Sequence, residues 1–571
     1  MNPTVMSIAM KDMGELIEYA NANNKVIPGP VFNVVGYGAD PTGVQVSTEA
    51  IQNAIDDANA AGGGVVYLPS GTYLTGKLKL YRRVILNGSG RYDTKLLLVP
   101  FTTVSAMIET ENFIPTGEIS NPEDVPYGFA IQNMTLDGNR GSGAVANGIN
   151  IYGYDMRIIG VIVQNFAARG IYTNWNVPTW IDGFNGRPDT NSFIEDVQIK
   201  LNGKEGLYWQ GPNDSVITRL MCYSNSLEDS GPDYDTYSNM VVHGDGYGLQ
   251  VSDSHFWNTG KYQIEVEAPG FMLTNSQLEG GFQGQLRIAQ WQSAISNTRF
   301  YSGKMSENVY TGNGSTKTFN YTFRIDDPAR IKVFVNNVLQ VVNTDFTVTG
   351  LGSDSGGTVT FTNAPASGAR VVLALYWRGT NRGIVFDTGA DVGTLTGCIF
   401  YHCCDGSIYF NDTNLMGASQ IEATVYQEDG RVVNGNSPSN TCLVTVNKSG
   451  NADYGQYVPR DVRMGLIDAY ACATYSAPST VAVQKSHNIG TITKTADHTY
   501  RFTFASAALN NNYAVVVTTN DAWFTGGSVP VPQIIAKTTT YFDVFMMYAV
   551  SPPSASNDPG VIHVIVTGMY P

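Results

Sequence analysis

The sequence has few charged side chains. Lys, Arg, Asp and Glu make up 15% of the 571 residues, where about a quarter is usual. The formal charge is −15, and because nucleic-acid and anionic-membrane binders use clusters of Lys and Arg, we expect neither partner. No apolar run of about 18 residues occurs, which argues against membrane insertion. Residues 1–24 lack a basic segment followed by an apolar one, so we expect no signal peptide.

Cysteine and histidine are scarce, with six of each. No C-x-x-C pair and no H-E-x-x-H segment occurs, so we expect no metal site and no disulfide framework. The glycine clusters are not followed by Gly-Lys-Ser/Thr, which argues against a phosphate-binding loop. We therefore predict no cofactor, and we interpret the cysteines as small buried apolar residues.

Glycine, by contrast, is abundant at 60 residues, and aromatic residues make up 11% of the chain, as is typical of a β-protein with many turns. Residues 1–30 form an N-terminal segment with a short helix predicted at 6–22. A second helix is predicted at 47–61, since Ile51, Ala54, Ile55 and Ala58 form one apolar stripe. Three glycines at 62–64 end it.

After residue 125 the chain repeats itself. Similar eight-residue segments begin at Ile131, Ile158, Ile194, Ile217, Val251, Leu273, Ile295 and Leu395, in steps of 27, 36, 23, 34, 22, 22 and 100 residues. Most are followed by a second alternating segment, such as Ile264-Glu265-Val266-Glu267, whose first and third residues should point inward. This pattern predicts a parallel β-helix of coils of about 22 residues that stack at about 4.8 Å, with loops in the longer coils.

The pattern also predicts the domains. The β-helix occupies residues 31–303 and resumes at 380–450, and the step of 100 residues contains an inserted small β domain at 304–379. Residues 451–571 alternate without the 22-residue period and predict a β-sandwich-like C-terminal domain. We assign that domain to trimerisation or glycan binding, with a simple end cap of the solenoid as the alternative.

Residues 32–43, the helix and the segment 62–73 (GGGVVYLPSGTY) resemble the start of the pectate-lyase-superfamily β-helix, in the version typical of bacteriophage tailspikes. The resemblance implies an all-β, right-handed parallel β-helix whose helix caps the open end. It also implies a homotrimer in the phage virion that acts on capsular polysaccharide or O-antigen at the bacterial surface. Contact with phage tail proteins would use an N-terminal anchor that is short or missing here, since about 30 residues precede the β-helix.

Catalytic residues of that family follow no fixed motif, so we take candidates from the outward columns of the predicted strands. Glycoside hydrolysis needs one carboxylic acid and one carboxylate, and one region concentrates acidic, basic and aromatic residues. The catalytic candidates are Glu265, Glu267, Glu279 and Asp245; the substrate-binding candidates are His243, Arg287, Trp257, Tyr223 and Tyr301, with Trp175 and Trp180 in a long loop. The alternatives are a solvated face, an ion pair with the arginine of the next coil, and a packed Trp257.

We therefore predict an endo-acting glycoside hydrolase that degrades a bacterial surface polysaccharide through a carboxylate pair. One alternative is a polysaccharide lyase, with His243, Arg287 or Lys200 as base. Others are a receptor-binding tail fibre that grips the glycan without cutting it, and a bacterial enzyme acting on pectin. The net charge of −15 favours a neutral or weakly charged polysaccharide over a polyanion.

Overall fold

The computed structural model describes a large part of the chain. The described residues are 30–115, 124–175, 192–228, 236–244, 246–376, 379–390, 392–411, 419–426, 433–435, 442–449, 469–477, 480–487, 489–496, 499–504, 514–520, 531–547 and 561–567. The helix predicted at 6–22 lies outside them. The chain divides into two compact units, one of residues 1–438 with 444–458 and one of residues 439–443 with 459–571.

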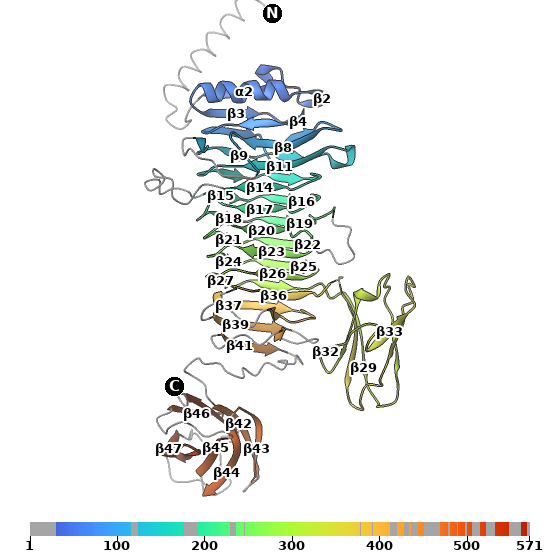
Figure 1. Ribbon diagram of the computed structural model, residues 1–571, viewed down its shortest axis with the longest axis vertical. Coiled ribbons are helices and arrows are strands. Elements are labelled where there is room, and N and C mark those ends of the chain that lie inside the picture. Colours follow the sequence, from blue (N-terminus) through green and yellow to red (C-terminus); the bar gives the residue numbers. More distant parts are fainter. Residues whose placement is uncertain are drawn as a thin grey trace, which may run out of the picture. The chain divides into compact units, whose positions relative to one another are not determined.

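Helix α2 (Thr48–Ala60) covers the N-terminal end of the first unit, as the sequence predicted (Figure 1). Its apolar stripe of Ile51, Ala54, Ile55 and Ala58 is fully buried. The helix contacts β1 (Val31–Asn33), β3 (Gly64–Leu68) and β5 (Leu78–Leu80). It therefore covers the open end of the stacked strands, where unpaired backbone groups would otherwise invite edge pairing.

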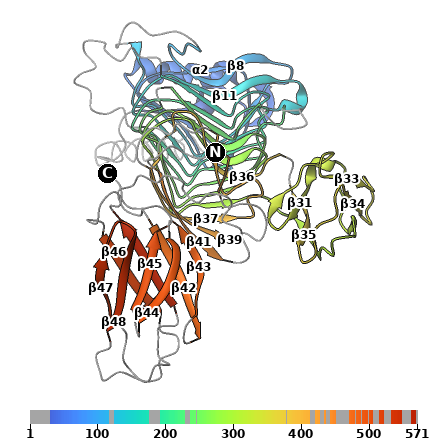
Figure 2. The ribbon, with the colours of Figure 1, turned by 60° about the horizontal axis from the view of Figure 1, so that its bottom comes forward.

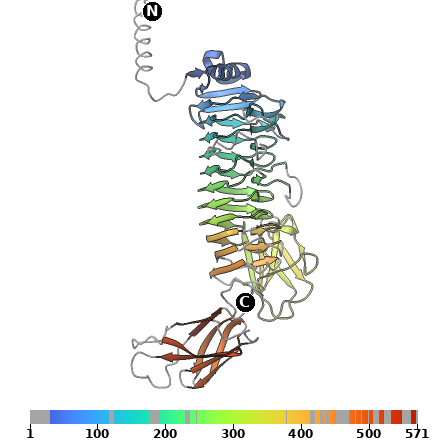
Figure 3. The ribbon, with the colours of Figure 1, turned by 60° about the vertical axis from the view of Figure 1, so that its left-hand side comes forward.

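Behind the helix, short parallel strands stack coil upon coil into a right-handed β-helix (Figures 1 and 3). A typical coil consists of β21 (Gln250–Ser252), β22 (His255–Thr259) and β23 (Tyr262–Glu267). We call the faces formed by these three strands and their equivalents in other coils the first, second and third face. Within the described residues the third face is an 11-stranded parallel sheet that runs from β5 to β40 (Val433–Gly435).

Seven of the eight-residue segments predicted as single strands contain two strands and a corner, and the segment at Leu395 lies largely within the single strand β37 (Val392–Tyr401). The third residue of every segment has a left-handed backbone conformation, for example φ 51° at Asp253 and φ 49° at Asn275. The full set is Asn133, Gly160, Asp196, Arg219, Asp253, Asn275, Asn297 and Gly397. Gly, Asn and Asp adopt this conformation at the least cost. The backbone N–H of Asn275 donates to the carbonyl of Ser296 in the next coil at 3.2 Å, so the corners also form a hydrogen-bonded column.

The spacing at this corner is constant over seven coils, since two residues link the first-face strand to the second-face strand from β9 (Ala130–Gln132) and β10 (Thr135–Asp137) onward. The links at the other two corners vary in length. For example, residues 224–239 lie between β19 (Met221–Tyr223) and β20 (Met240–His243).

The interior of the coils is largely apolar, and a column of buried amides lies at the corner between the second and third faces. Asn202 donates to Asn225 at 2.8 Å, Asn225 to Asn239 at 2.7 Å, and Asn239 to Gln263 at 2.6 Å. All four side chains are buried. Each amide has one acceptor and one donor group, so the column satisfies buried polar groups of successive coils.

Between β28 (Arg299–Tyr301) and β36 (Arg382–Phe386) the chain forms two small antiparallel sheets. One contains β29 (Ser306–Thr311), β35 (Arg370–Leu375), β31 (Ile331–Val335) and β32 (Val338–Leu339); the other contains β30 (Thr318–Tyr321), β34 (Gly357–Phe361) and β33 (Phe346–Thr349). Their facing side chains form a separate buried cluster that includes Phe319, Phe346 and Leu373.

The second unit contains two four-stranded antiparallel sheets, which make it sandwich-like (Figure 2). One sheet has the order β43 (Thr480–His487), β42 (Ala469–Ala477), β49 (Val561–Thr567), β46 (Ala514–Asn520). The other has the order β44 (Ile489–Ala496), β45 (Thr499–Phe504), β48 (Tyr541–Met547), β47 (Val531–Lys537). Tyr500, Phe502 and Phe542 are fully buried, and the rings of Phe502 and Phe542, on neighbouring strands, stack with their centres 5.0 Å apart.

Candidate functional site

The candidate residues lie on two faces of the β-helix rather than in one cluster. Tyr223, Trp257, Glu279 and Tyr301 belong to the second face, through β19, β22, β25 (Gln277–Gly281) and β28. The third face carries His243, Glu265, Glu267 and Arg287 through β20, β23 and β26 (Gly284–Ile288). The corner between β22 and β23 separates the two groups, so the single cluster expected from the sequence is wrong in this respect.

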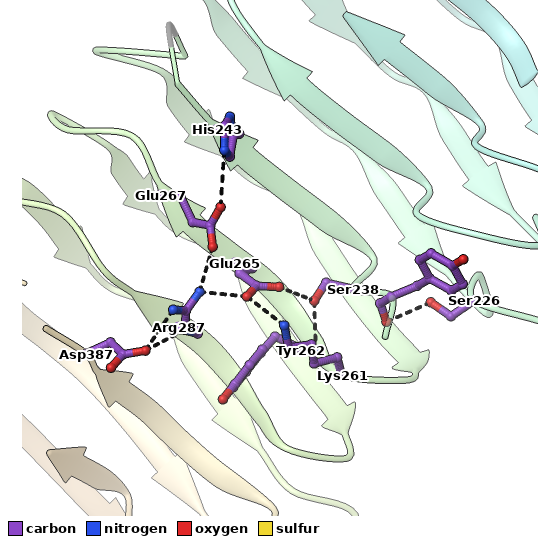
Figure 4. Close-up of polar contacts among 10 residues, drawn as sticks. Ser226, Ser238, His243, Lys261, Tyr262, Glu265, Glu267, Arg287 and Asp387 are labelled. Atoms are coloured by element: carbon purple, nitrogen blue, oxygen red, sulfur yellow. Dashed lines mark hydrogen bonds and ion pairs between the residues drawn. The ribbon is translucent and has the colours of Figure 1, made fainter. Parts of the chain in front are cut away.

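Arg287 is the centre of the third-face group (Figure 4). Its Nη1 lies 2.7 Å from Glu265 Oε1 and 2.9 Å from Glu267 Oε1, and its Nε and Nη2 lie 2.9 and 2.7 Å from Asp387 Oδ2. Burial alone would lower the pKa of Arg287, but the charge of Glu265 and the hydrogen bonds to Asp387 and Glu267 raise it. One guanidinium therefore connects three carboxylates that come from the two coils on either side of its own. We call Glu265, Glu267, Arg287 and Asp387 the arginine cluster.

Within the arginine cluster, Glu265 is the buried member. It is 5% exposed, and it also accepts from Lys261 Nζ at 3.0 Å and from Ser238 Oγ at 3.0 Å. A carboxylate with two cationic partners and a hydroxyl donor has its acceptor positions occupied by neighbouring side chains. Glu265 therefore matches the structural alternative, an ion pair with the arginine of the next coil.

Glu267 and Asp387 are the accessible carboxylates of the cluster, with 34% and 24% of their side chains exposed. Sequence reasoning missed Asp387 as a candidate. The signal was available, because Ile384-Val385-Phe386-Asp387 has the same alternation as Ile264-Glu265-Val266-Glu267. The inserted domain separates these two segments along the chain, but β26 and β36 are hydrogen-bonded neighbours.

His243 extends the cluster toward the N-terminal coils. Its Nε2 lies 3.6 Å from Glu267 Oε2, and its ring lies 6.0 Å from that of Tyr208, which the sequence did not single out. Nδ1 of His243 is buried and has no hydrogen-bond partner among the described residues. The imidazole therefore lies beside Glu267 at ion-pair distance, beyond the length of a direct hydrogen bond.

Glu279 and His255 form a separate pair on the second face. His255 Nε2 lies 3.1 Å from Glu279 Oε1, and Gln277 Nε2 donates to Glu279 Oε2 at 3.1 Å. The hydrogen bond with His255 lowers the pKa of Glu279, partial burial opposes this shift, and Gln277 adds to it. A carboxylate held in its ionised form is poorly suited to act as a general acid.

The aromatic residues of the second face stack on one another. Tyr223 and Trp257 lie 4.0 Å apart with an interplanar angle of 7°, and His255 lies 4.2 Å from Trp257. Lys200 Nζ lies 5.7 Å from the Tyr223 ring. Since Trp257 already has two close ring neighbours, its arrangement favours packing over sugar stacking, as in the alternative stated from the sequence.

Tyr301 and Trp175 contact residues outside the arginine cluster. The hydroxyl of Tyr301 donates to the carbonyl of Lys304 at 3.2 Å, and burial raises the pKa of Tyr301. Trp175 is 7% exposed and packs against Tyr152 and Tyr154, so its ring is part of a core cluster. Asp245 and Trp180 lie outside the described residues.

No group of three or more His, Cys, Asp or Glu side chains in the described segments is arranged to hold a metal ion. Four cysteines, Cys222, Cys398, Cys403 and Cys404, are buried free thiols, and burial raises the pKa of Cys398 to about 11. Among the described helices, none has the length and apolar character needed to span a membrane.

The fold thus defines a parallel β-helix protein with polar and aromatic side chains gathered on its outer faces. Residues 31–302 match a family model described as rhamnogalacturonase A/epimerase, pectate lyase-like. This part of the chain carries every described candidate except Asp387. The resemblance stated from the sequence to the pectate-lyase-like β-helix superfamily is confirmed.

Individual relatives match parts of the chain. Mannuronan C5-epimerase AlgE3 of Azotobacter vinelandii is 30% identical over 269 residues, which cover 44% of this chain and 14% of the epimerase. The SPbeta prophage-derived uncharacterized protein YomE of Bacillus subtilis is 28% identical over 158 residues, 24% of each chain. The chain therefore spans a small part of the length of these curated relatives.

Among solved structures, tailspike protein gp49 of Acinetobacter baumannii bacteriophage Fri1, a capsular polysaccharide depolymerase, is similar with a TM-score of 0.39 and 11% identity. The match covers 94% of this chain and 84% of that chain.

Proposed function

We propose that this protein is an endo-acting polysaccharide depolymerase of the tailspike type, a glycoside hydrolase whose reacting carboxylates are Glu267 and Asp387. The observation that carries the proposal is the arginine cluster, where Arg287 connects two partly exposed carboxylates on the outer surface of the third face. Contacts of 2.9 and 2.7 Å to the two ends of one guanidinium place the carboxyl groups on the order of 7 Å apart, a separation that leaves room for a water, as in inverting enzymes.

The contacts suggest different roles for the two carboxylates. Asp387 receives two bonds from Arg287, which fix the orientation of its carboxylate, and we assign it as the general base that activates water. Glu267 receives one bond from Arg287 and lies beside His243, which can return a proton to it after each turnover. We therefore assign Glu267 as the general acid, His243 as its proton partner, and Glu265 as a positioning residue for Arg287.

The test uses Glu267→Gln and Asp387→Asn, which preserve size and hydrogen bonding. The substrates are purified capsular polysaccharides from a panel of bacterial strains, and the readouts are size-exclusion chromatography and product mass. Each variant should lose about 10²–10⁴-fold in cleavage rate, and each cut should add one water to the products. Glu195→Gln is the matched control, because Glu195 pairs with Arg219 on the first face. Full activity in either cluster variant would contradict the assignment.

Proton abstraction from a uronic acid is the second candidate, as in a lyase or an epimerase. It is favoured by the sequence similarity to a mannuronan C5-epimerase over 44% of this chain. His243 would then be the base and Arg287 would neutralise the sugar carboxylate; Lys200, on the second face, lies apart from both. Elimination adds no water and produces an unsaturated sugar that absorbs near 235 nm, while epimerisation leaves the chain length unchanged.

As a tailspike, the protein would be a homotrimer located in the virion and attached to phage tail proteins through residues before the β-helix. Its substrate would be a capsular polysaccharide or O-antigen. Similarity to a prophage-derived protein supports a phage origin. Truncation after Ser449 tests the role of the C-terminal unit: an intact trimer would exclude trimerisation. Saturable binding without shortening of any polysaccharide would instead indicate a receptor-binding fibre.

A further inference from the structure

Arg169 is held in a fixed orientation on the third face by three side chains. Its Nε lies 2.9 Å from Glu205 Oε2. Its guanidinium carbon lies 5.1 Å from the centre of the Tyr172 ring and 4.6 Å from that of Tyr208. Glu205 has 8% of its side chain exposed. A guanidinium that lies against two neighbouring aromatic rings, with one nitrogen bound to a nearly buried carboxylate, has little rotational freedom left to lose on binding.

The outer end of this guanidinium is available. The side chain of Arg169 is 29% exposed, and within the described residues the contact with Glu205 uses Nε, with no hydrogen bond from either η nitrogen. By contrast, Arg287 uses both of its η nitrogens and Nε on carboxylates. The two η nitrogens of Arg169 therefore form a donor pair, the geometry that binds a carboxylate with two parallel hydrogen bonds.

The position of Arg169 connects it with the arginine cluster along one face. Tyr172 in β14 (Ile171–Asn174) pairs with Tyr208 in β17 (Leu207–Gln210), and two further coils lead to Glu267. Three coil steps span about 14 Å at about 4.8 Å each. Burial raises the pKa of Tyr208, Arg169 opposes the shift, and the charges of Glu205 and Glu267 add to it. Tyr208 is therefore close enough to feel the charges of both Arg169 and Glu267 of the arginine cluster.

We infer that Arg169, with Tyr172 and Tyr208, is a binding subsite for an acidic sugar of the polysaccharide, whose carboxylate is bound by the two η nitrogens. The inference rests on the proposed function, which supplies a polysaccharide as the substrate. It adds the chemical class of that substrate, a polysaccharide whose repeating unit contains a carboxylated sugar. It differs from the expectation of a neutral glycan drawn from the net charge, because one oriented guanidinium at short range outweighs distant, screened charges.

Carboxyl reduction of the polysaccharide provides the test. A panel of acidic and neutral capsular polysaccharides is immobilised, each in native and carboxyl-reduced form, and binding of the whole chain is measured. We expect native acidic polymers to bind and reduction to weaken binding about tenfold or more. Arg169→Gln should lose the same factor on the native form and nothing further on the reduced form. Arg169→Lys keeps the charge but not the paired donors, and should fall between.

Two further variants guard against misfolding and general charge effects. Arg169→Gln combined with Glu205→Gln removes the nearly buried charge that the single variant leaves unpaired, and should bind like Arg169→Gln. Arg157→Gln is the matched control, since Arg157 lies 5.6 Å from the Phe193 ring on the first face, and it should bind like the wild type.

Equal binding of native and reduced polymers, wild-type binding by Arg169→Gln, or binding of neutral polymers alone would overturn the inference. Absence of binding to every polymer would overturn both proposals. Binding with the expected pattern but without cleavage would overturn the hydrolase alone, so the two failures are distinguishable.

Discussion

Asn239 joins its own coil to the next one through the buried amide column, and Asn239→Ala should be strongly destabilising. Its Nδ2 lies 2.6 Å from Gln263 Oε1, 3.1 Å from the Cys222 carbonyl and 3.2 Å from the Trp257 carbonyl, and its Oδ1 accepts from Asn225 at 2.7 Å. The side chain is fully buried. At about 1 kcal/mol per hydrogen bond, with a further cost for groups left unpaired, the opening free energy should fall by about 3–5 kcal/mol.

Because a solenoid can open coil by coil, the assay is native-state hydrogen exchange, with mass spectrometry of peptides that contain β20 and β23. The control is Gln250→Ala on the exposed first face, which should change the opening free energy by less than about 0.5 kcal/mol. Asn239→Asp should lose as much as the alanine variant, because it replaces three donor contacts with a buried charge. A loss below about 1 kcal/mol in Asn239→Ala would refute the reasoning.

Three further predictions concern a corner and the two charged groups. Asn275 has φ 49°, so Asn275→Val should cost about 1–2 kcal/mol and Asn275→Gly much less, measured by thermal unfolding; equal costs would contradict the corner argument. The pKa of Glu279 lies below its usual 4.5 because of His255, so the pair stabilises the fold above about pH 4.5 and this contribution is lost as the pH falls through the lower folded-state value. The stability difference between wild type and Glu279→Gln should therefore shrink as unfolding is measured from about pH 6 to about pH 3, and a constant difference would contradict it. Arg287→Met leaves Glu265 and two other carboxylates without this cation, and should cost about 3–5 kcal/mol in denaturant unfolding; a stabilised variant would show that the cluster is not held by charge.

The fold was predictable because stacking imposes the same demand on every coil. Apolar residues must recur at inward positions, so the segments from Ile131 onward reveal the period, and the stripe of α2 reveals the cap. The corners were missed because alternation alone does not distinguish one bent segment from one strand. The signal was the third residue of each segment, which is Asn, Asp or Gly except at Arg219.

The candidate site was predictable only in part. Neighbouring coils bring Glu265 beside Arg287 and Glu267 beside His243, as the repeat implied. Two facts depend on geometry that the repeat does not contain. The corner between β22 and β23 turns Glu279 and Glu267 to different faces, and the inserted domain hid the return of the chain beside β26 that delivers Asp387.

The constant two-residue link between the first and second faces has a consequence for how such a chain can be altered. The other two corners accept anything from a tight turn to the whole inserted domain between β28 and β36, and the next strand still returns to its register. The link of fixed length thus sets the register of each coil, while the two links of variable length are the positions at which new segments can be inserted. We expect a foreign loop inserted within residues 229–235, which leaves Asn225 and Asn239 of the amide column in place, to leave the solenoid intact. A single extra residue after Asn275 should shift every inward side chain of β25 to the outer surface.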